Sequence, residues 1–308
     1  MQQSLKGQNV RLATIDELTG EARVFAKSTS CTVTLNVNTD DTSTKDDVSL
    51  ASKPTATSQS WQLSLESLEV SDVVEMLAAI KSMQPITVLY DEVSTADNQT
   101  ALGAAFARSG KAYINDVTFN FNDREISSKS IQLQGIGELQ KLQGAPEMDI
   151  IEVDSNYLRG QYVRLFLGGD GTTTPAAVLA ASKSLSLHVS LSLEDSTTKD
   201  TPGTWTIQEP TGLSFDITTS ALVRSADTIT SSVPGKTFAD LEDIKEAMSP
   251  VRFEIAHVGG ANNRTKQDVI VAGLVLVTSI TNNNPNRQNS TWDCTLSGYG
   301  AYEVPSES

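Results

Sequence analysis

The amino-acid sequence predicts a mainly β protein made of two tandem β-sandwich or barrel domains, each with one flanking α-helix. Two observations support this fold class. Apolar and polar residues alternate along several short segments, which is typical of strands that bury one face. Short motifs also recur in the same order in the two halves of the 308-residue chain. The repeat predicts a first copy at 1–142, a linker at 143–156 and a second copy at 157–308.

The repeat consists of short motifs that keep their order and nearly keep their spacing. Lys6-Gly-Gln-Asn-Val-Arg-Leu12, for example, returns as Arg159-Gly-Gln-Tyr-Val-Arg-Leu165. The second copy carries extra residues between Leu222 and Thr237. In chain order the recurring segments are 6–12 with 159–165, 42–46 with 196–200, 83–86 with 248–251, and 135–137 with 298–300.

Each copy is expected to contain about seven short strands and one helix, in the same order. The clearest strand alternates through Cys31, Val33, Leu35 and Val37, with polar residues between them. The predicted elements, with those of the second copy in parentheses, are strands at 9–15 (162–167), 31–37 (185–193) and 61–65 (215–217), a helix at 71–83 (237–248), and strands at 86–90 (251–257), 111–121 (269–281) and 130–139 (290–303).

The two predicted helices have start and stop signals. In the first, Val73, Leu77 and Ile80 lie on one face, and Ser71 is the expected N-cap. The second opens on Thr237-Phe-Ala-Asp240, which is typical of a capping box. A proline follows each helix, at positions 85 and 250, and ends the helical pattern.

The sequence offers no catalytic, cofactor-binding or metal-binding residues, so we expect no cofactor and no enzyme activity. His188 lies on the polar face of a strand and His257 ends another, without the motif of a zinc site. Cys31 and Cys294 each occupy a slot that is apolar in the other copy, so both are expected in the core. The Gly-x-Gly at 135–137 ends a strand and is better explained by a bulge or a close backbone approach.

Charge and hydropathy exclude further classes of function. The formal net charge is −15 and no Lys/Arg cluster is present, so specific nucleic-acid binding is not expected. No apolar run has the length of a membrane span, and the N-terminal residues do not form a signal peptide. We therefore expect no membrane span and synthesis in a cytoplasm.

A long polar segment follows the second strand of each copy, at 38–59 and 192–211. Bare loops of this length are uncommon in compact domains unless they have a function. The core of the segment recurs in both copies, which indicates a defined contact with a neighbouring subunit. The candidate inter-subunit residues are Thr42, Ser43, Thr44, Lys45, Asp46, Ser196, Thr197, Thr198, Lys199 and Asp200.

The order of these motifs resembles the major tail tube proteins of tailed bacteriophages. The resemblance rests on the strand at 28–35, the loop Leu193-Glu-Asp-Ser-Thr-Thr-Lys-Asp200, the segment Gly110-Lys-Ala-Tyr-Ile-Asn-Asp-Val117 and the closing Gly135-Ile-Gly-Glu-Leu139. It implies β-sandwich units that form rings of six, stacked into a hollow tube around DNA. It also implies that the loop after the second strand reaches a neighbouring subunit.

With two copies in one chain, a ring of six units would need three chains, so we expect a trimer with pseudo-sixfold symmetry. The resemblance further implies a place in the virion after synthesis in the host bacterial cytoplasm. The expected partners are the protein itself and other tail proteins such as the tape measure, terminator and baseplate, while DNA passes without specific binding. The alternatives are a tube or baseplate-hub component of a contractile injection machine, or a duplicated carbohydrate-binding β-sandwich.

Overall fold

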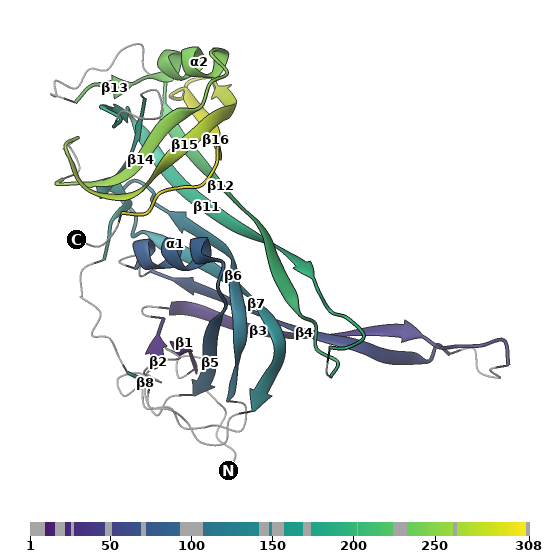
Figure 1. Ribbon diagram of the computed structural model, residues 1–308. Coiled ribbons are helices and arrows are strands. Elements are labelled where there is room, and N and C mark those ends of the chain that lie inside the picture. The colour runs from purple at the N-terminus through teal and green to yellow at the C-terminus, as the bar shows by residue number, and fades with distance from the viewer. Residues whose placement is uncertain are drawn as a thin grey trace.

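The computed structural model shows a mainly β protein with two helices, as the sequence predicts. Figure 1 shows two lobes, one formed by the first half of the chain and one by the second, with two long hairpins projecting from them. The structure describes residues 10–15, 22–25, 28–46, 51–68, 72–92, 107–141, 148–149, 157–168, 174–201, 203–223, 233–260 and 264–305.

The first half contains eight strands and one helix among its described residues. They are β1 Val10–Ile15, β2 Ala22–Val24, β3 Ser28–Asp41, β4 Pro54–Ser67, α1 Val73–Ser82, β5 Ile86–Glu92, β6 Arg108–Asn120, β7 Ser128–Lys141 and β8 Met148–Asp149.

The described part of the second half repeats this series after one short 3-10 turn, η2. Its elements are η2 Gly160–Tyr162, β9 Val163–Leu167, β10 Ala177–Leu179, β11 Ser182–Asp195, β12 Gln208–Leu222, β13 Gly235–Lys236, α2 Phe238–Glu246, β14 Val251–Val258, β15 Lys266–Asn283 and β16 Thr291–Gly298.

The two halves share one strand order. In the first half the hydrogen-bonded order is β3-β4-β7-β6-β5-β1-β2-β8, and in the second it is β11-β12-β16-β15-β14-β9-β10-β13. Both series end on a short parallel pair, β2 with β8 and β10 with β13. The halves are not separate sheets, because β11 pairs with β6 and joins all sixteen strands into one sheet.

The core consists of the apolar faces of the alternating strands, closed by one helix in each half. Trp61, Leu63 and Leu65 of β4 are buried, and so is the face of α1 that carries Val73, Leu77 and Ile80. Burying such a set of side chains is the main stabilising term of a fold of this kind. The main cluster of buried side chains contains residues of both halves.

The helices begin close to the predicted positions. α1 starts at Val73 with Asp72 as its N-cap, and the predicted cap Ser71 lies outside the described residues. α2 starts at Phe238 with the predicted capping box, in which the Asp240 carboxylate accepts hydrogen bonds from Thr237. Both helices are followed by a methionine in the left-handed region, Met83 and Met248.

Several strand predictions need correction. The strands on either side of the polar segment 38–59 are longer than predicted, since β3 continues to Asp41 and β4 already begins at Pro54. The Thr and Ser residues of the segment suit this extended hairpin. The two-residue and three-residue strands β2, β8, β10 and β13 were too short to produce a pattern. β16 ends at Gly298, and Glu303 then makes an isolated bridge with Ala272 instead of extending it. Of the predicted linker, only β8 lies among the described residues.

Candidate self-assembly interface

The second half docks onto the first through five paired residues of β11 and β6. The antiparallel ladder runs from Ser186 opposite Asn120 to Ser190 opposite Asp116. On one face of this ladder Val189 and its partner Val117 are fully buried. The other face carries polar side chains, so the junction has the amphipathic character of the sheets it joins.

A hydrogen bond between two side chains also crosses the junction. His188 of β11 places Nε2 at 2.6 Å from Oδ2 of Asp116 on β6. The two side chains remain partly exposed, at 40% and 27%. The sequence predicts that His188 lies on the polar face of a strand, either exposed or at an interface. In the structure, His188 lies at the contact between the two halves.

The turn between β6 and β7 adds backbone hydrogen bonds to the contact between the two halves. The amide of Phe121 donates to the carbonyl of Leu185 at 2.8 Å, and the amide of Asp123 donates to Lys183 at 2.8 Å. The backbone of Asn122 lies against Gly160, where an added Cβ would come within 2.3 Å of the Asn122 carbonyl oxygen. A side chain at position 160 would therefore push this turn away, which explains why glycine occupies it.

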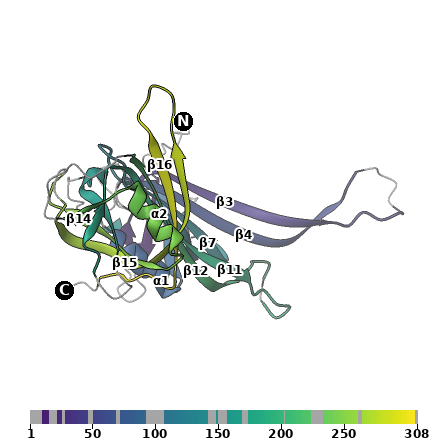
Figure 2. The ribbon, with the colours of Figure 1, turned by 90° about the horizontal axis from the view of Figure 1, so that it is seen from above.

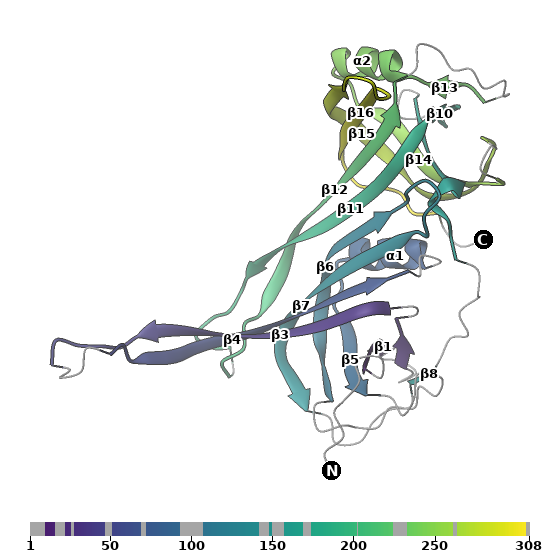
Figure 3. The same ribbon diagram turned by 180° about the vertical axis from the view of Figure 1, so that it is seen from behind.

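The long hairpin of the second half also reaches the first half. Figures 2 and 3 show the β3–β4 and β11–β12 hairpins, here called the two arms, projecting from the same side of the molecule. Gln59 of β4 donates its amide to Thr204 at 2.7 Å and accepts from Thr206 at 2.9 Å. The amide of Gly137 then donates to the Thr206 carbonyl at 3.0 Å. The segment after the second strand thus contacts the neighbouring copy, in this case within one chain.

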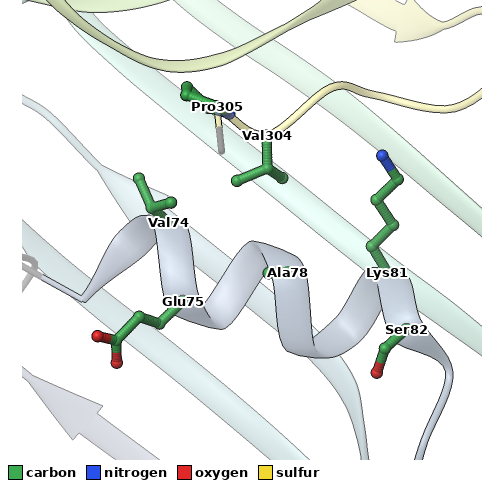
Figure 4. A pocket seen from close by; sticks show the side chains of 7 residues that line it. All are labelled: Val74, Glu75, Ala78, Lys81, Ser82, Val304 and Pro305. Atoms are coloured by element: carbon green, nitrogen blue, oxygen red, sulfur yellow. The ribbon is translucent and has the colours of Figure 1, made fainter. Parts of the chain in front are cut away.

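A final contact lies behind the helix of the first half. The hydroxyl of Tyr302 donates to the carbonyl of Leu77 in α1 at 2.7 Å. Beside it, a cavity of about 700 Å³ separates α1 from the C-terminal segment at Val304 and Pro305 (Figure 4). Its lining combines helix side chains such as Val74 and Ala78 with the edge of the second half, so it belongs to the same junction.

Apolar side chains on β3, at the edge of the first half, are exposed, whereas their counterparts on β11 in the second half are buried. Val189 and Leu191 of β11 are 0% and 5% exposed. Leu35 and Val37, at the matching positions of β3 in the repeat, are 60% and 55% exposed. Met248, after α2, is 84% exposed and adds an apolar side chain on the outer side of the second half. Large exposed apolar side chains at a sheet edge mark an interaction surface.

The predicted inter-subunit residues lie at the ends of the two arms. In both arms an aspartate holds the turn: Asp41 accepts from the amide of Ser43 at 2.9 Å, and Asp195 accepts from Thr197 at 2.9 Å. Thr42 and Ser196 form backbone hydrogen bonds to Lys53 and Ile207, within their own arm. Every residue of 42–46 is exposed, as are those of 197–200.

Within the chain, the contact with the other half is made by other residues of the polar segment 192–211, and the contact of 42–46 and 196–200 with a neighbouring subunit stays a prediction. Thr204 and Thr206, a few residues beyond the repeated motif, make the contact through their backbone. Backbone hydrogen bonds carry no side-chain signature, so the sequence could predict the polar segment 192–211 as a contact but not the two residues that make it. Trp205, which lies between them, was the sequence feature that could have indicated this contact. An isolated tryptophan in a polar loop often packs against another part of the protein, and here Trp205 packs against the hydrophobic core.

The two cysteines and His257 are at least partly buried, and burial shifts the pKa of each. Cys294 is buried as predicted, whereas Cys31 is only partly buried. Burial raises the pKa of the Cys31 thiol to about 11 and that of Cys294 to about 12. Burial lowers the pKa of His257, which keeps its ring neutral. In the described part of the chain, no group of three His, Cys, Asp or Glu side chains could hold a metal ion, and no helix is long and apolar enough to cross a membrane.

Comparison with solved structures found weak similarities. No family model matches the sequence, and no curated protein matches it. A chain in the tail of an empty gene transfer agent particle, computed with C6 symmetry, is similar at 16% identity with a TM-score of 0.37. A chain in the virion of the native gene transfer agent particle is similar at 16% identity with a TM-score of 0.35. Each match covers 48% of this chain and 99% of the other chain. Similarity at this level does not by itself bear on what the chain does.

Proposed function

We propose that this chain is a structural protein that polymerises into the hollow tail tube of a tailed bacteriophage, through which DNA passes. Each ring of the tube contains three chains, whose six copies give pseudo-sixfold symmetry. The protein acts in the virion, without catalysis or a cofactor. Its partners are further copies of itself and the tail proteins at the two ends of the tube.

The observation that carries this proposal is the docking of one copy onto the other within the chain. The two halves have the same strand order but meet through different patches, β11 on one side and β6 on the other. A contact between two different patches of equivalent units is heterologous, and repeating it generates a ring or a helical filament. The motifs that resemble tail tube proteins favour the closed ring of six units.

The charge of the protein suits a tube that contains DNA. A net charge of −15 gives a surface that repels phosphate, so DNA can slide past it instead of binding. A basic lining would hold the DNA and slow its passage. The acidic composition therefore supports a conduit rather than a nucleic-acid receptor.

The carbohydrate-binding alternative expects aromatic side chains on the surface. Trp61 and Trp292 are 0% and 1% exposed, and Trp205 packs partly buried against the core. Neither Trp61 nor Trp292 therefore offers a free ring face for stacking on a sugar. Their burial favours the structural function.

Electron microscopy of the purified, concentrated full-length protein tests the proposal. We expect hollow tubes or rings, and native mass spectrometry of a ring should give three times the 33.0 kDa of one chain. A monodisperse monomer at every concentration would contradict the proposal. Rings of another stoichiometry would reject the threefold arrangement and leave self-assembly intact.

The predicted role of the arm ends can be tested separately. Deleting residues 42–47 and 196–200 removes the turns but leaves the core strands paired, so both halves should stay folded by circular dichroism. We expect the shortened protein to lose assembly, because the arms project away from the body of the chain (Figure 2), where a neighbouring copy would contact them. Tubes of normal appearance from this variant would show that the arm ends make no essential contact.

A further inference from the structure

We infer which strands join neighbouring chains: β3 of one copy adds to the end of β15 in the next copy, with Leu35 opposite Ile280. This inference rests on the proposed function and specifies its interface. The pairing is antiparallel and covers Thr32–Asn36 of β3 and Ser279–Asn283 of β15. It repeats, between chains, the ladder that β11 and β6 form within the chain.

The first step is the equivalence of the β6–β7 and β15–β16 hairpins. Val117 pairs with Ile131 in the first half, and Ile280 pairs with Cys294 in the second. Both ladders shift register just before this pair, between Ile114 and Asp116 and between Val277 and Ser279. Both turns also hold an arginine in the left-handed region, at positions 124 and 287, each with φ of 61°. The hairpins therefore superimpose residue by residue, and Val117 corresponds to Ile280.

The second step is that β15 has an open side where β6 has a partner. β5 pairs with β6 only as far as Ala112, and β11 then occupies the same side from Asp116 to Asn120. β14 likewise pairs with β15 only as far as Val275. From Ser279 onward, the only ladder that β15 forms among the described strands is with β16.

The third step is that β3 has an open side where β11 has a partner. β11 pairs with β12 on one side and with β6 on the other. β3 pairs with β4 alone among the described strands. The exposed Leu35 is the counterpart of Val189, which is fully buried against β6. Among the described strands, Leu35 therefore lacks a strand equivalent to β6, against which Val189 packs.

The chemistry of the two open edges is complementary. Neither β3 from Ser28 to Thr39 nor the chain from Val269 to Asn286 contains a charged residue. Exposed sheet edges usually carry charges that prevent pairing, so two long uncharged edges are suited to pair. In the inferred register Leu35 meets Ile280 on one face and Thr34 meets Thr281 on the other, which matches apolar with apolar and polar with polar.

The occupant of each edge is a second copy of this chain. β3 and the end of β15 belong to different halves and do not pair with each other within the chain, whereas the equivalent strands β11 and β6 do. The two edges are different patches, so each added copy offers a new free edge of the same kind. This is the geometry that a ring of three chains needs.

A pair of cysteines tests the register directly. In a background that carries Cys31→Ser and Cys294→Ala, Leu35→Cys combined with Ile280→Cys places two thiols at facing positions, where Cα atoms about 4.5–5.5 Å apart suit a disulfide. Cys294 is removed because it pairs with position 280 on β16 and would form a competing disulfide within the chain. We expect mild oxidation of the assembled full-length protein to remove most of the monomer band from a non-reducing gel, with covalent dimers and trimers in its place. A monomer band that persists in protein seen as rings would overturn the inference and leave the proposed function standing.

Two controls make the test specific. Leu35→Cys with Thr281→Cys shifts the pair by one residue, so the thiols point to opposite faces and the protein should stay monomeric on the gel. Leu35→Cys alone should also give no dimer. Dimers from this single variant would indicate twofold pairing of β3 with β3 and would overturn the inference.

A charge on the edge gives a second, independent measurement. Leu35 is exposed in the single chain, so Leu35→Lys should leave the urea midpoint unchanged while assembly is lost. Normal tubes from Leu35→Lys would contradict the inferred interface. Absence of rings and tubes from the unmodified protein would instead reject the proposed function, and this inference with it.

Discussion

The indole ring of Trp61 lies so close to Gly135 that a Cβ atom on this glycine would come within 2.1 Å of the ring. The indole Nε1 also donates to the carbonyl of Gly137 at 2.9 Å. The second half repeats the packing with Phe215 against Gly298, where a Cβ would come within 2.4 Å. The Gly-x-Gly segments therefore make room for an aromatic ring that packs flat on the strand.

Replacing Gly135 with alanine should destabilise the protein. The methyl group forces the indole or the strand to move, and overpacking of this kind costs about 1–3 kcal/mol of the free energy of unfolding. Urea denaturation followed by tryptophan fluorescence measures the loss. Gly212→Ala on β12 is the matched control, because an added Cβ there meets no atom within 4 Å. Equal midpoints for the two variants would show that the close packing is not required.

The ion pair between the buried Lys129 and the partly exposed Asp72 should anchor α1 to the sheet. The Lys129 side chain is 0% exposed and its ammonium contacts both carboxylate oxygens of Asp72, the N-cap of the helix. Lys129→Met leaves the Asp72 carboxylate without its cation, which should cost about 1.5–3 kcal/mol in the free energy of unfolding. Arg124→Gln is the control, because that arginine pairs with Asp123 on the surface and should matter by about 0–1 kcal/mol. A Lys129→Met protein as stable as the control would refute this anchoring.

The turn at the end of the first arm should depend on pH. The hydroxyl and the amide of Ser43, and the amide of Lys53, donate to Asp41 and lower the pKa of its carboxyl below the usual 3.8. Because the folded pKa is depressed, the stabilisation is complete above pH 3.8 and is lost as the pH falls through the folded value. Carbon NMR of the Asp41 carboxyl should therefore give a midpoint below 3.8, and Ser43→Ala should move it upward. A midpoint at 3.8 or above would contradict the turn.

Both cysteines should react slowly in the folded protein. Thiolate is the reactive form, and raising the thiol pKa from 9.0 to about 11 lowers the thiolate fraction of Cys31 at pH 8 about a hundredfold. Cys294 should be slower still. A thiol-reactive chromophore should label neither residue quickly until urea is added, and Cys31→Ser and Cys294→Ser assign the two phases. Rapid labelling in the absence of urea would show that the thiols are not desolvated.

Much of the fold could be predicted because each position in one copy can be compared with its counterpart in the other copy. An apolar slot filled by Cys294 in one copy and Ile131 in the other is recognisable as a core position, and the capping box at Thr237 marks a helix start independently of its environment. Comparing the copies could also have indicated the Lys129 ion pair. The matching position holds Trp292, which packs against Phe238 of α2, so the two halves attach their helices by different chemistry.

The contacts between the halves could not be predicted in the same way. The pairing of β11 with β6 depends on how two edges meet in space, and alternation along a strand shows only which face is buried. The contacts of Thr204 and Thr206 use backbone atoms that every residue has. The motif at 42–46 recurs at 196–200. Part of this recurrence is explained by the aspartate that holds each turn, Asp41 in the first arm and Asp195 in the second.

The ladder between β11 and β6 has a kinetic consequence, since both strands belong to one polypeptide. A tethered pair meets at an effective concentration in the millimolar range, whatever the amount of protein in solution. This junction therefore forms by a first-order reaction in each newly folded chain. A strand that pairs with another molecule, as we propose for β3, meets its partner only by diffusion, and the rate of these encounters rises with concentration. Dilution should consequently leave the paired halves of each chain intact while it slows every later step of growth.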